Sequence, residues 1–249
     1  MSMNSTIRTL RILEAVAQHQ PVTVGELTKL FGLPKSTVQR SLLTLADAGW
    51  LRASRGDTTR WEVGARVLAV RPAAVHGASL FAAARDPMVR LKDAVDETVH
   101  LAVPDGLLEM VLVDRVDCDR AVRTFHQIGT TSPMHATATG RAVLAHLPQE
   151  DVAEVVTRGL DSYSDSTITD PAQLQVDLDR IRHEGYAVNR DQFRPEVCAV
   201  AAPVLAADGN PIAAVAISMP DSRFAPDKVP QWGELVAQTA AEISSRHEA

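Results

Sequence analysis

One stretch decides the fold of the first part of the chain: Pro34-Lys35-Ser36-Thr37-Val38-Gln39-Arg40-Ser41. The proline predicts the first turn of a helix, where its missing N–H leaves no bond unmade. Apolar residues then recur at helical spacing as far as Ala48, and the outward-facing residues of the first turns are polar or basic. Such an N-terminal face is typical of the recognition helix of a helix-turn-helix motif, which lies in the major groove of DNA.

Two further helices are expected before this one, and two strands after it. Apolar residues recur at helical spacing over 5–19 and 23–31, and the second segment begins with the capping-box pattern Thr-x-x-Glu. Short strands are expected over 50–53 and 60–63, joined by turn-forming residues. Three helices and a hairpin within 65 residues are typical of a winged helix-turn-helix.

The polar side chains of this region have the chemistry that DNA recognition requires. Gln39 can pair with adenine through two hydrogen bonds, and Arg40 can pair with guanine. Hydroxyl groups and backbone N–H groups at a helix start suit phosphates, and arginines on the hairpin suit the DNA backbone or the minor groove. The alternative is an ordinary three-helix subdomain with a solvated basic face. The predicted DNA-binding residues are Lys35, Ser36, Thr37, Gln39, Arg40, Arg52, Arg55 and Arg60.

Charge is distributed unevenly along the chain. The net charge of −6 over 249 residues argues by itself against a nucleic-acid binder. Residues 1–65, however, contain 8 Lys and Arg against 5 Asp and Glu, whereas the remaining 184 residues contain 17 against 26. A basic head of net charge +3 and an acidic body of net charge −9 therefore predict two domains with different partners.

The composition excludes several classes of protein. Hydrophobic residues make up 45% and charged residues 22%, which is the balance of a globular protein. The longest apolar run is far shorter than the ~18 residues of a membrane span, and the first residues lack the apolar stretch of a signal peptide. We therefore expect a cytoplasmic protein with no membrane partner. Cys118 and Cys198 form no zinc or redox motif, so we expect reduced, buried thiols.

The body of the chain predicts an α+β domain. After an alanine-rich, helical linker that Pro72 should interrupt, strands and helices mix without the regular alternation of a doubly wound sheet. The expected helices cover 85–97, 139–146, 149–158, 170–185 and 226–247, and the expected strands cover 98–103, 110–116, 122–125, 186–189, 198–205 and 212–218.

The order and spacing of several short motifs resemble the IclR family of bacterial transcription regulators over almost the whole chain. In the head these motifs are Arg8-Thr-Leu-Arg-Ile-Leu-Glu-Ala-Val, Gly32-Leu-Pro-Lys-Ser-Thr-Val-Gln-Arg and Leu45-Ala-Asp-Ala-Gly-Trp. In the body they are Glu97-Thr-Val-His-Leu-Ala-Val, Val113-Asp-Arg-Val, His135-Ala-Thr-Ala-Thr-Gly-Arg-Ala, Thr167-Ile-Thr-Asp-Pro, Ile181-Arg-His-Glu-Gly-Tyr-Ala-Val and Ala201-Ala-Pro-Val.

The resemblance implies that the chain has separate domains for DNA binding and for effector binding. Residues 1–65 would form the winged helix-turn-helix, 66–84 a linker helix, and 85–249 a GAF-like α+β domain that binds a small organic effector. Family members form dimers through the first helix and the linker, and the dimers often pair into tetramers. A symmetric dimer implies a palindromic DNA operator, and the effectors of the family are mostly carboxylates and aromatic catabolites.

The resemblance also implies an effector pocket. In glyoxylate-responsive members the ligand lies against a loop, an acidic residue, a cysteine and two serines, and this chain has Asn189, Ala199 and Ala216 in place of the acid, the cysteine and one serine. Each lost polar partner costs about 1–3 kcal/mol, so we expect an effector larger and less polar than glyoxylate. The predicted effector-binding residues are His135, Thr137, Ala138, Thr139, Asn189, Ala199, Ala216 and Ser218.

The sequence offers little support for other classes of function. It has no GxSxG, GxxxxGK[ST] or GxGxxG motif and no histidine pair at metal-binding spacing, so we predict no catalytic residues, no metal and no cofactor. One alternative is an enzyme, a hydrolase or isomerase, whose head serves only for dimerisation. Another is a sensor whose head binds a protein partner instead of DNA.

Overall fold

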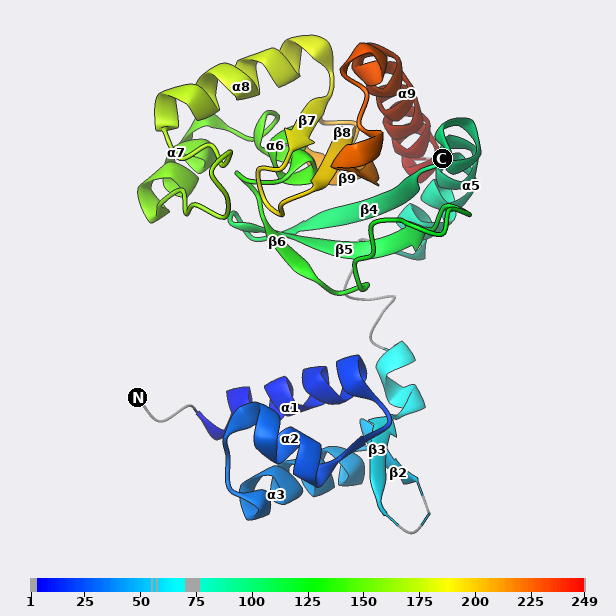
Figure 1. Cartoon of the computed structure of the whole chain (residues 1–249), viewed down its shortest axis with the longest axis vertical. Coiled ribbons are helices and arrows are strands. Elements are labelled where there is room, and N and C mark those ends of the chain that lie inside the picture. Colours follow the sequence, from blue (N-terminus) through cyan, green and yellow to red (C-terminus); the bar gives the residue numbers. More distant parts are fainter. Residues whose placement is uncertain (1–3, 55, 57, 70–76, 249) are drawn as a thin grey trace. The chain divides into compact units, whose positions relative to one another are not determined.

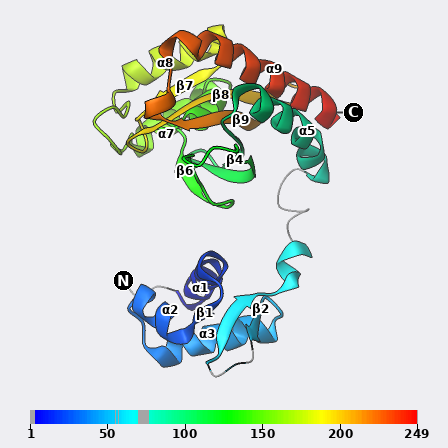
Figure 2. The same ribbon diagram turned by 45° about the vertical axis from the view of Figure 1, so that its right-hand side comes forward.

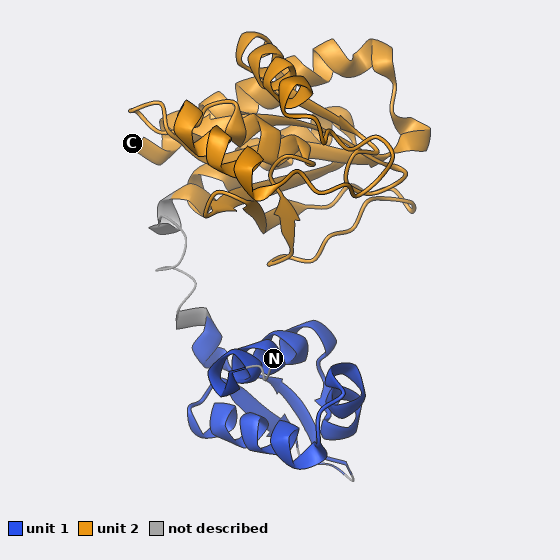
Figure 3. Ribbon diagram, turned by 90° about the vertical axis from the view of Figure 1, so that its left-hand side faces the viewer, with its two compact units in different colours: residues 1–77 blue, residues 78–249 orange. Residues whose placement is uncertain are grey.

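The computed structural model describes residues 4–54, 56, 58–69 and 77–248. The chain divides into two compact units, residues 1–77 and residues 78–249 (Figure 3). No helix within the described ranges is long and apolar enough to cross a membrane.

The N-terminal unit is a winged helix-turn-helix, as the sequence predicts. Its hairpin is completed by a two-residue strand that the sequence did not reveal, giving a sheet of order β1-β3-β2. Apolar side chains of the helices pack around Trp61, which is 2% exposed. The elements are α1 (Ser5–His19), β1 (Val22–Thr23), α2 (Val24–Phe31), α3 (Lys35–Asp47), β2 (Leu51–Ser54) and β3 (Arg60–Val63).

Local sequence signals fix the ends of α2. The backbone N–H of Thr23 donates to Glu26 Oε2 at 2.7 Å, and the N–H of Glu26 donates to Thr23 Oγ1 at 3.2 Å, so the predicted capping box is present. These bonds satisfy two N–H groups that a helix start leaves unpaired. Gly32 ends α2 with a φ of +60°, a backbone conformation that glycine adopts without strain. The turn then leads directly into α3.

The C-terminal unit contains a six-stranded antiparallel sheet of order β6-β5-β4-β9-β8-β7 (Figure 1). This confirms the expected α+β class. The strands are β4 (Thr98–Asp105), β5 (Glu109–Val116), β6 (Thr131–Pro133), β7 (Ala187–Arg190), β8 (Val197–Leu205) and β9 (Pro211–Pro220). The helices are α5 (Gly77–Val95), α6 (Ala138–Leu144), α7 (Gln149–Arg158), α8 (Pro171–Glu184) and α9 (Val229–Glu248), and short 3-10 turns cover Asp221–Arg223 and Pro226–Lys228.

Helices cover both faces of this sheet. The first and last helices of the unit, α5 and α9, lie side by side on one face (Figure 2), and the guanidinium of Arg90 on α5 contacts Glu242 on α9 at 2.7 Å. Helix α6 packs on β8 and β9 from the other face, and the core there includes Ala142 of α6, Leu178 of α8 and Ala216 of β9. Because side chains of a strand alternate between faces, every second residue of β4, β8 and β9 points toward the α6 side.

The structure differs from the sequence-based expectations at three places. Residues 77–95 form one helix that contains Pro87, whereas the helix was expected to begin at 85. Residues 122–125 are not a strand, because the edge of β5 pairs with β6 instead and leaves this segment in the loop between them. The predicted linker helix over 66–84 is described only in part: residues 65–69 form a 3-10 turn, and Pro72 lies outside the described residues.

Candidate DNA-binding surface and effector cavity

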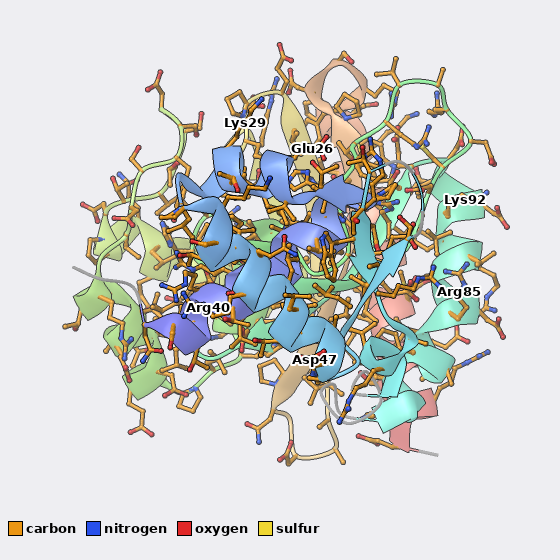
Figure 4. All side chains as sticks on the ribbon, turned by 90° about the horizontal axis from the view of Figure 1, so that it is seen from below. Glu26, Lys29, Arg40, Asp47, Arg85 and Lys92 are labelled. Carbon is orange, nitrogen blue, oxygen red and sulfur yellow. The ribbon has the colours of Figure 1, made fainter. Side chains whose placement is uncertain are left out.

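Helix α3 presents its predicted DNA-binding residues on the face opposite its buried stripe. Val38, Leu42 and Leu45 are buried in the core of the unit. Lys35, Ser36 and Arg40 are exposed, and Thr37 and Gln39 are half-buried at the border of this face. Figure 4 views the head from below and labels Arg40 on this helix.

The start of α3 leaves backbone donors available. Pro34 precedes the helix, and no side chain caps it within the part of the chain that the structure describes. The carbonyl of Pro34 accepts from the N–H groups of Thr37 and Val38, at 2.9 and 3.2 Å. The N–H groups of Lys35 and Ser36 have no such bond among the described contacts. Unpaired N–H groups beside a lysine are a suitable site for a DNA phosphate.

The arginines of the wing differ in their surroundings. Arg52 is exposed and pairs with Glu62 on the neighbouring strand at 2.8 Å, so its charge is partly balanced within the hairpin. Arg60 is exposed and donates from Nη1 to the carbonyl of Pro21 at 3.0 Å. Arg55, the third predicted wing residue, lies outside the described residues.

The C-terminal unit contains a cavity of about 690 Å³ on the α6 side of its sheet, partly open to solvent. A partly open hollow lined mainly by apolar side chains with a few polar groups is typical of a small-molecule site. Strand register brings its floor together: Ser218 pairs with Ala199, Ala199 pairs with Asn189, and Ala216 pairs with His100. The walls come from the start of α6 and from the loops that follow β5 and β7.

Seven of the eight predicted effector-binding residues line this cavity. They are Thr137, Ala138, Thr139, Asn189, Ala199, Ala216 and Ser218. The eighth, His135, is not among the lining residues, because its buried ring turns away and its Nε2 bonds the carbonyl of Asp161 at 2.9 Å. This ring also contacts that of Tyr163, with 5.9 Å between the centroids.

Two of the predicted polar anchors already have structural partners. The hydroxyl of Thr137 donates to the carbonyl of Pro133 at 2.9 Å and accepts from the N–H of Gly140 at 3.1 Å. The amide of Asn189 donates to the carbonyl of Ala136 at 2.6 Å. These residues therefore hold the start of α6 against the sheet, and the amide of Asn189 keeps a second N–H that can bind a ligand.

The close packing of α6 depends on a glycine. A Cβ atom at Gly140 would lie 2.2 Å from the carbonyl oxygen of Met134. Only glycine permits this approach of two backbones, which places the start of α6 at the cavity.

The sequence reasoning missed ten of the lining residues, and three of these have basic or imidazole side chains: His100 on β4, His126 in the loop after β5, and Arg194 in the loop after β7. Nη1 of Arg194 lies 2.9 Å from Nδ1 of His126. Because an arginine can only donate, Nδ1 of His126 accepts and its proton is on Nε2. The rings of His100 and His126 meet edge to face, with 5.4 Å between the centroids.

Both imidazoles are neutral at neutral pH. Burial, with smaller contributions from the neighbouring His126 and Arg115, lowers the pKa of His100 to about 3. Burial likewise lowers the pKa of His126 to about 4, with contributions from Arg194 and Arg115. Among the lining residues that the structure describes none is acidic, so the charge of the lining comes from Arg194.

A buried arginine holds the loop that carries Arg194. The side chain of Arg141 on α6 is 1% exposed and donates to Asp177 on α8 at 2.6 Å and to the carbonyl of Val188 at 2.7 Å. It also donates to the amide oxygen of Gln192. One residue thus connects two helices, a strand and the cavity loop.

A second polar cluster lies beside the cavity loop. The side chains of Asp191, Cys198 and Asp221 lie within 4.8 Å of one another. Arg190 balances the charge of Asp221 at 2.9 Å and lowers the pKa of its carboxyl group. Burial raises the pKa of the Cys198 thiol to about 12, so this sulfur stays protonated at neutral pH.

A winged helix-turn-helix and an α+β unit with a partly open cavity define a DNA-binding transcription regulator that responds to a small molecule. Residues 5–55 match the IclR helix-turn-helix domain, and residues 72–245 match the bacterial transcriptional regulator IclR C-terminal domain. The chain belongs to the IclR family of transcription regulators.

Individual relatives agree with this assignment. The transcriptional repressor IclR of Escherichia coli K12 is 32% identical over 245 residues, which are 97% of this chain and 89% of that protein. The crystal structure of the Thermotoga maritima IclR has a TM-score of 0.80 at 25% identity, with both chains fully covered. An IclR homologue from Microbacterium hydrocarbonoxydans, complexed with 4-hydroxybenzoate, shares the fold with a TM-score of 0.80 at 24% identity, covering 98% and 99% of the two chains.

Proposed function

We propose that this protein represses genes of a small-molecule catabolic pathway and releases its operator when an organic acid or aromatic catabolite binds the cavity of the C-terminal unit. The observation that carries the proposal is the exposed polar N-terminal face of α3, with Lys35, Ser36 and Arg40 around unpaired backbone donors. Repression is supported by the relatives, since the similar protein of E. coli is a repressor.

The proposed DNA contacts divide into two kinds. Arg40 and Gln39 read base edges in the major groove, whereas Lys35, Ser36 and the wing arginines contact phosphates. Arg52 would exchange its bond with Glu62 for a phosphate oxygen, because the arginine side chain is 72% exposed.

We further propose that the protein acts in the cytoplasm as a dimer or tetramer on a palindromic operator. Exposed apolar residues on α1, Ile7 and Leu10, are 50% and 51% accessible and offer a surface for the second subunit. A symmetric dimer binds half-sites about one helical turn of DNA apart. Analytical ultracentrifugation of the protein with a duplex operator measures the stoichiometry, and one monomer per duplex would contradict the proposal.

DNA binding is distinguished from the alternatives by its salt dependence. Contacts to about 8 phosphates give a log–log slope of affinity against salt near −7. Fluorescence anisotropy measures this slope when a duplex selected from genomic DNA by the protein is titrated at several salt concentrations. A slope near zero would favour a protein partner for the head, and turnover of a substrate by the intact chain without DNA binding would favour an enzyme.

A further inference from the structure

His100 is the one described lining residue of the effector cavity that is both more than nine-tenths buried and left with an unpaired side-chain nitrogen. Its residue exposure is 7%, and Nε2 has no hydrogen-bond partner among the described residues. A buried, unpaired polar atom costs about 1–3 kcal/mol. A ligand with a hydrogen-bonding group at this point removes that cost.

Arg194 provides the complementary charge. It is exposed, and one of its N–H groups is bonded to the neutral ring of His126. The described residues give it no acidic partner, and its guanidinium lies 5.3 Å from the centre of the Phe193 ring. The other N–H groups of this planar cation match the two oxygens of a carboxylate.

The lining around these two groups is mostly apolar, with a few serine and threonine hydroxyls. Three alanines on the sheet, Ala102, Ala199 and Ala216, leave room that larger side chains would fill, and Phe193 and Leu112 provide apolar walls. His126 contacts both polar groups, through its hydrogen bond with Arg194 and its edge-to-face contact with His100. A ligand that meets both must therefore pass across the His126 ring.

We propose that the effector is a singly charged acid whose carboxylate binds Arg194 and whose second, uncharged hydrogen-bonding group binds Nε2 of His100. This inference rests on the proposed function and specifies its ligand. A second carboxylate is disfavoured because the described lining residues offer it no cation besides Arg194, and burying an unpaired charge is costly. Amines are disfavoured because none of the described lining residues is acidic.

Isothermal titration calorimetry with simple acids tests the proposal on the full-length protein without DNA. The probes are benzoate, 3- and 4-hydroxybenzoate, terephthalate, phenol and pyruvate. Of the two hydroxybenzoates, the one with the higher affinity is expected to bind at least tenfold more tightly than benzoate. Terephthalate and pyruvate are expected to bind at least tenfold more weakly than this hydroxybenzoate. Equal binding of terephthalate, or tighter binding of pyruvate, overturns the proposal.

Variants separate the two contacts. His100→Phe keeps a ring of similar size, and it is expected to weaken the hydroxybenzoate about tenfold while leaving benzoate within twofold. His100→Gln, which retains a hydrogen-bonding group, is expected to restore part of the preference. Arg194→Met is expected to weaken both acids at least tenfold and to leave phenol unchanged. The matched controls are His183→Phe and Arg158→Met, on exposed residues of α8 and α7 outside the cavity.

The proposal is wrong if His100→Phe weakens the binding of benzoate and hydroxybenzoate equally, or if Arg194→Met leaves the affinity for both acids unchanged. It is also wrong if no ring acid binds to a protein that still retains genomic DNA fragments, an outcome that leaves the regulator function intact. Loss of DNA binding with intact binding of the acids contradicts the proposed function and not this inference.

Discussion

Replacement of Arg141 by methionine tests how the cavity loop is held. Arg141 is buried and makes three hydrogen bonds, to Asp177, to the carbonyl of Val188 and to the amide oxygen of Gln192. Methionine fills much of the same volume but cannot donate. Asp177 then loses a close charged partner, and two acceptors lose a donor.

The expected cost follows from these contacts. Breaking a buried charged pair by removal of one partner costs about 3–5 kcal/mol. Burial opposes the charged form of Arg141 and lowers its pKa. Removing the guanidinium therefore brings a gain in stability, and the range of about 3–5 kcal/mol already includes this gain. Asp177 keeps its contact with Arg180 at 2.8 Å, which places the expected value at the lower end, about 3 kcal/mol.

Urea unfolding of the full-length protein, followed by circular dichroism, measures this loss. With an m-value of about 2 kcal/mol per molar urea, the midpoint for the C-terminal unit should fall by about 1.5 M. The matched control is Arg180→Met, because Arg180 contacts the same carboxylate but is about one-third exposed, so its loss should cost no more than about 1 kcal/mol. The reasoning is refuted if Arg141→Met costs less than about 1 kcal/mol, or if the control costs as much.

Three further predictions concern the head and the histidine pair. Thr23→Ala should destabilise the N-terminal unit by about 1 kcal/mol through loss of the capping box; an unchanged melting curve of that unit would contradict this. Arg40→Ala should weaken operator binding by about 1–3 kcal/mol in anisotropy titrations. Lys29→Ala, on α2, should change the binding free energy by no more than about 0.5 kcal/mol. Equal effects of the two variants would argue against α3 as the recognition helix. Because the pKa of His100 is about 3 when folded and about 6.5 when unfolded, only the unfolded chain takes up this proton as the pH falls below 6.5. Wild type should therefore lose about 2 kcal/mol more stability than His100→Phe between pH 7.5 and pH 5, and parallel losses in urea titrations would contradict the burial of this ring.

The winged head could be predicted almost completely from local sequence. Helical spacing, the capping box of Thr23 and the glycine turn at Gly32 act within a few residues, and the structure retains each of them. The strand β1 escaped prediction because two residues carry no periodicity and pair only with the distant β3. In the body, Val122 and Phe125 have the composition of a strand, but both are exposed in a loop because β6 takes the place beside β5.

The cavity was harder to predict because it is assembled by strand register. The residues of β7, β8 and β9 came from the family resemblance, and the structure places them together. His100 becomes visible only when β4 is set against β9, where it pairs with Ala216. Arg194 and His126 come from loops, for which no periodic signal exists. Period-2 spacing from His100 to Ala102 was the available clue, since both side chains must face the same side of the sheet.

The measurement that tests the central claim most directly is recovery of genomic DNA. Fragmented DNA of the source organism is incubated with the purified protein and with a Gln39→Ala, Arg40→Ala double variant, and the bound fragments are sequenced. We predict enrichment of a few palindromic sites by the wild type, loss of that enrichment in the double variant, and release of the sites by acids that bind the cavity. No enrichment by the wild type, with or without a cell metabolite extract, would contradict the assignment of this protein as a DNA-binding regulator.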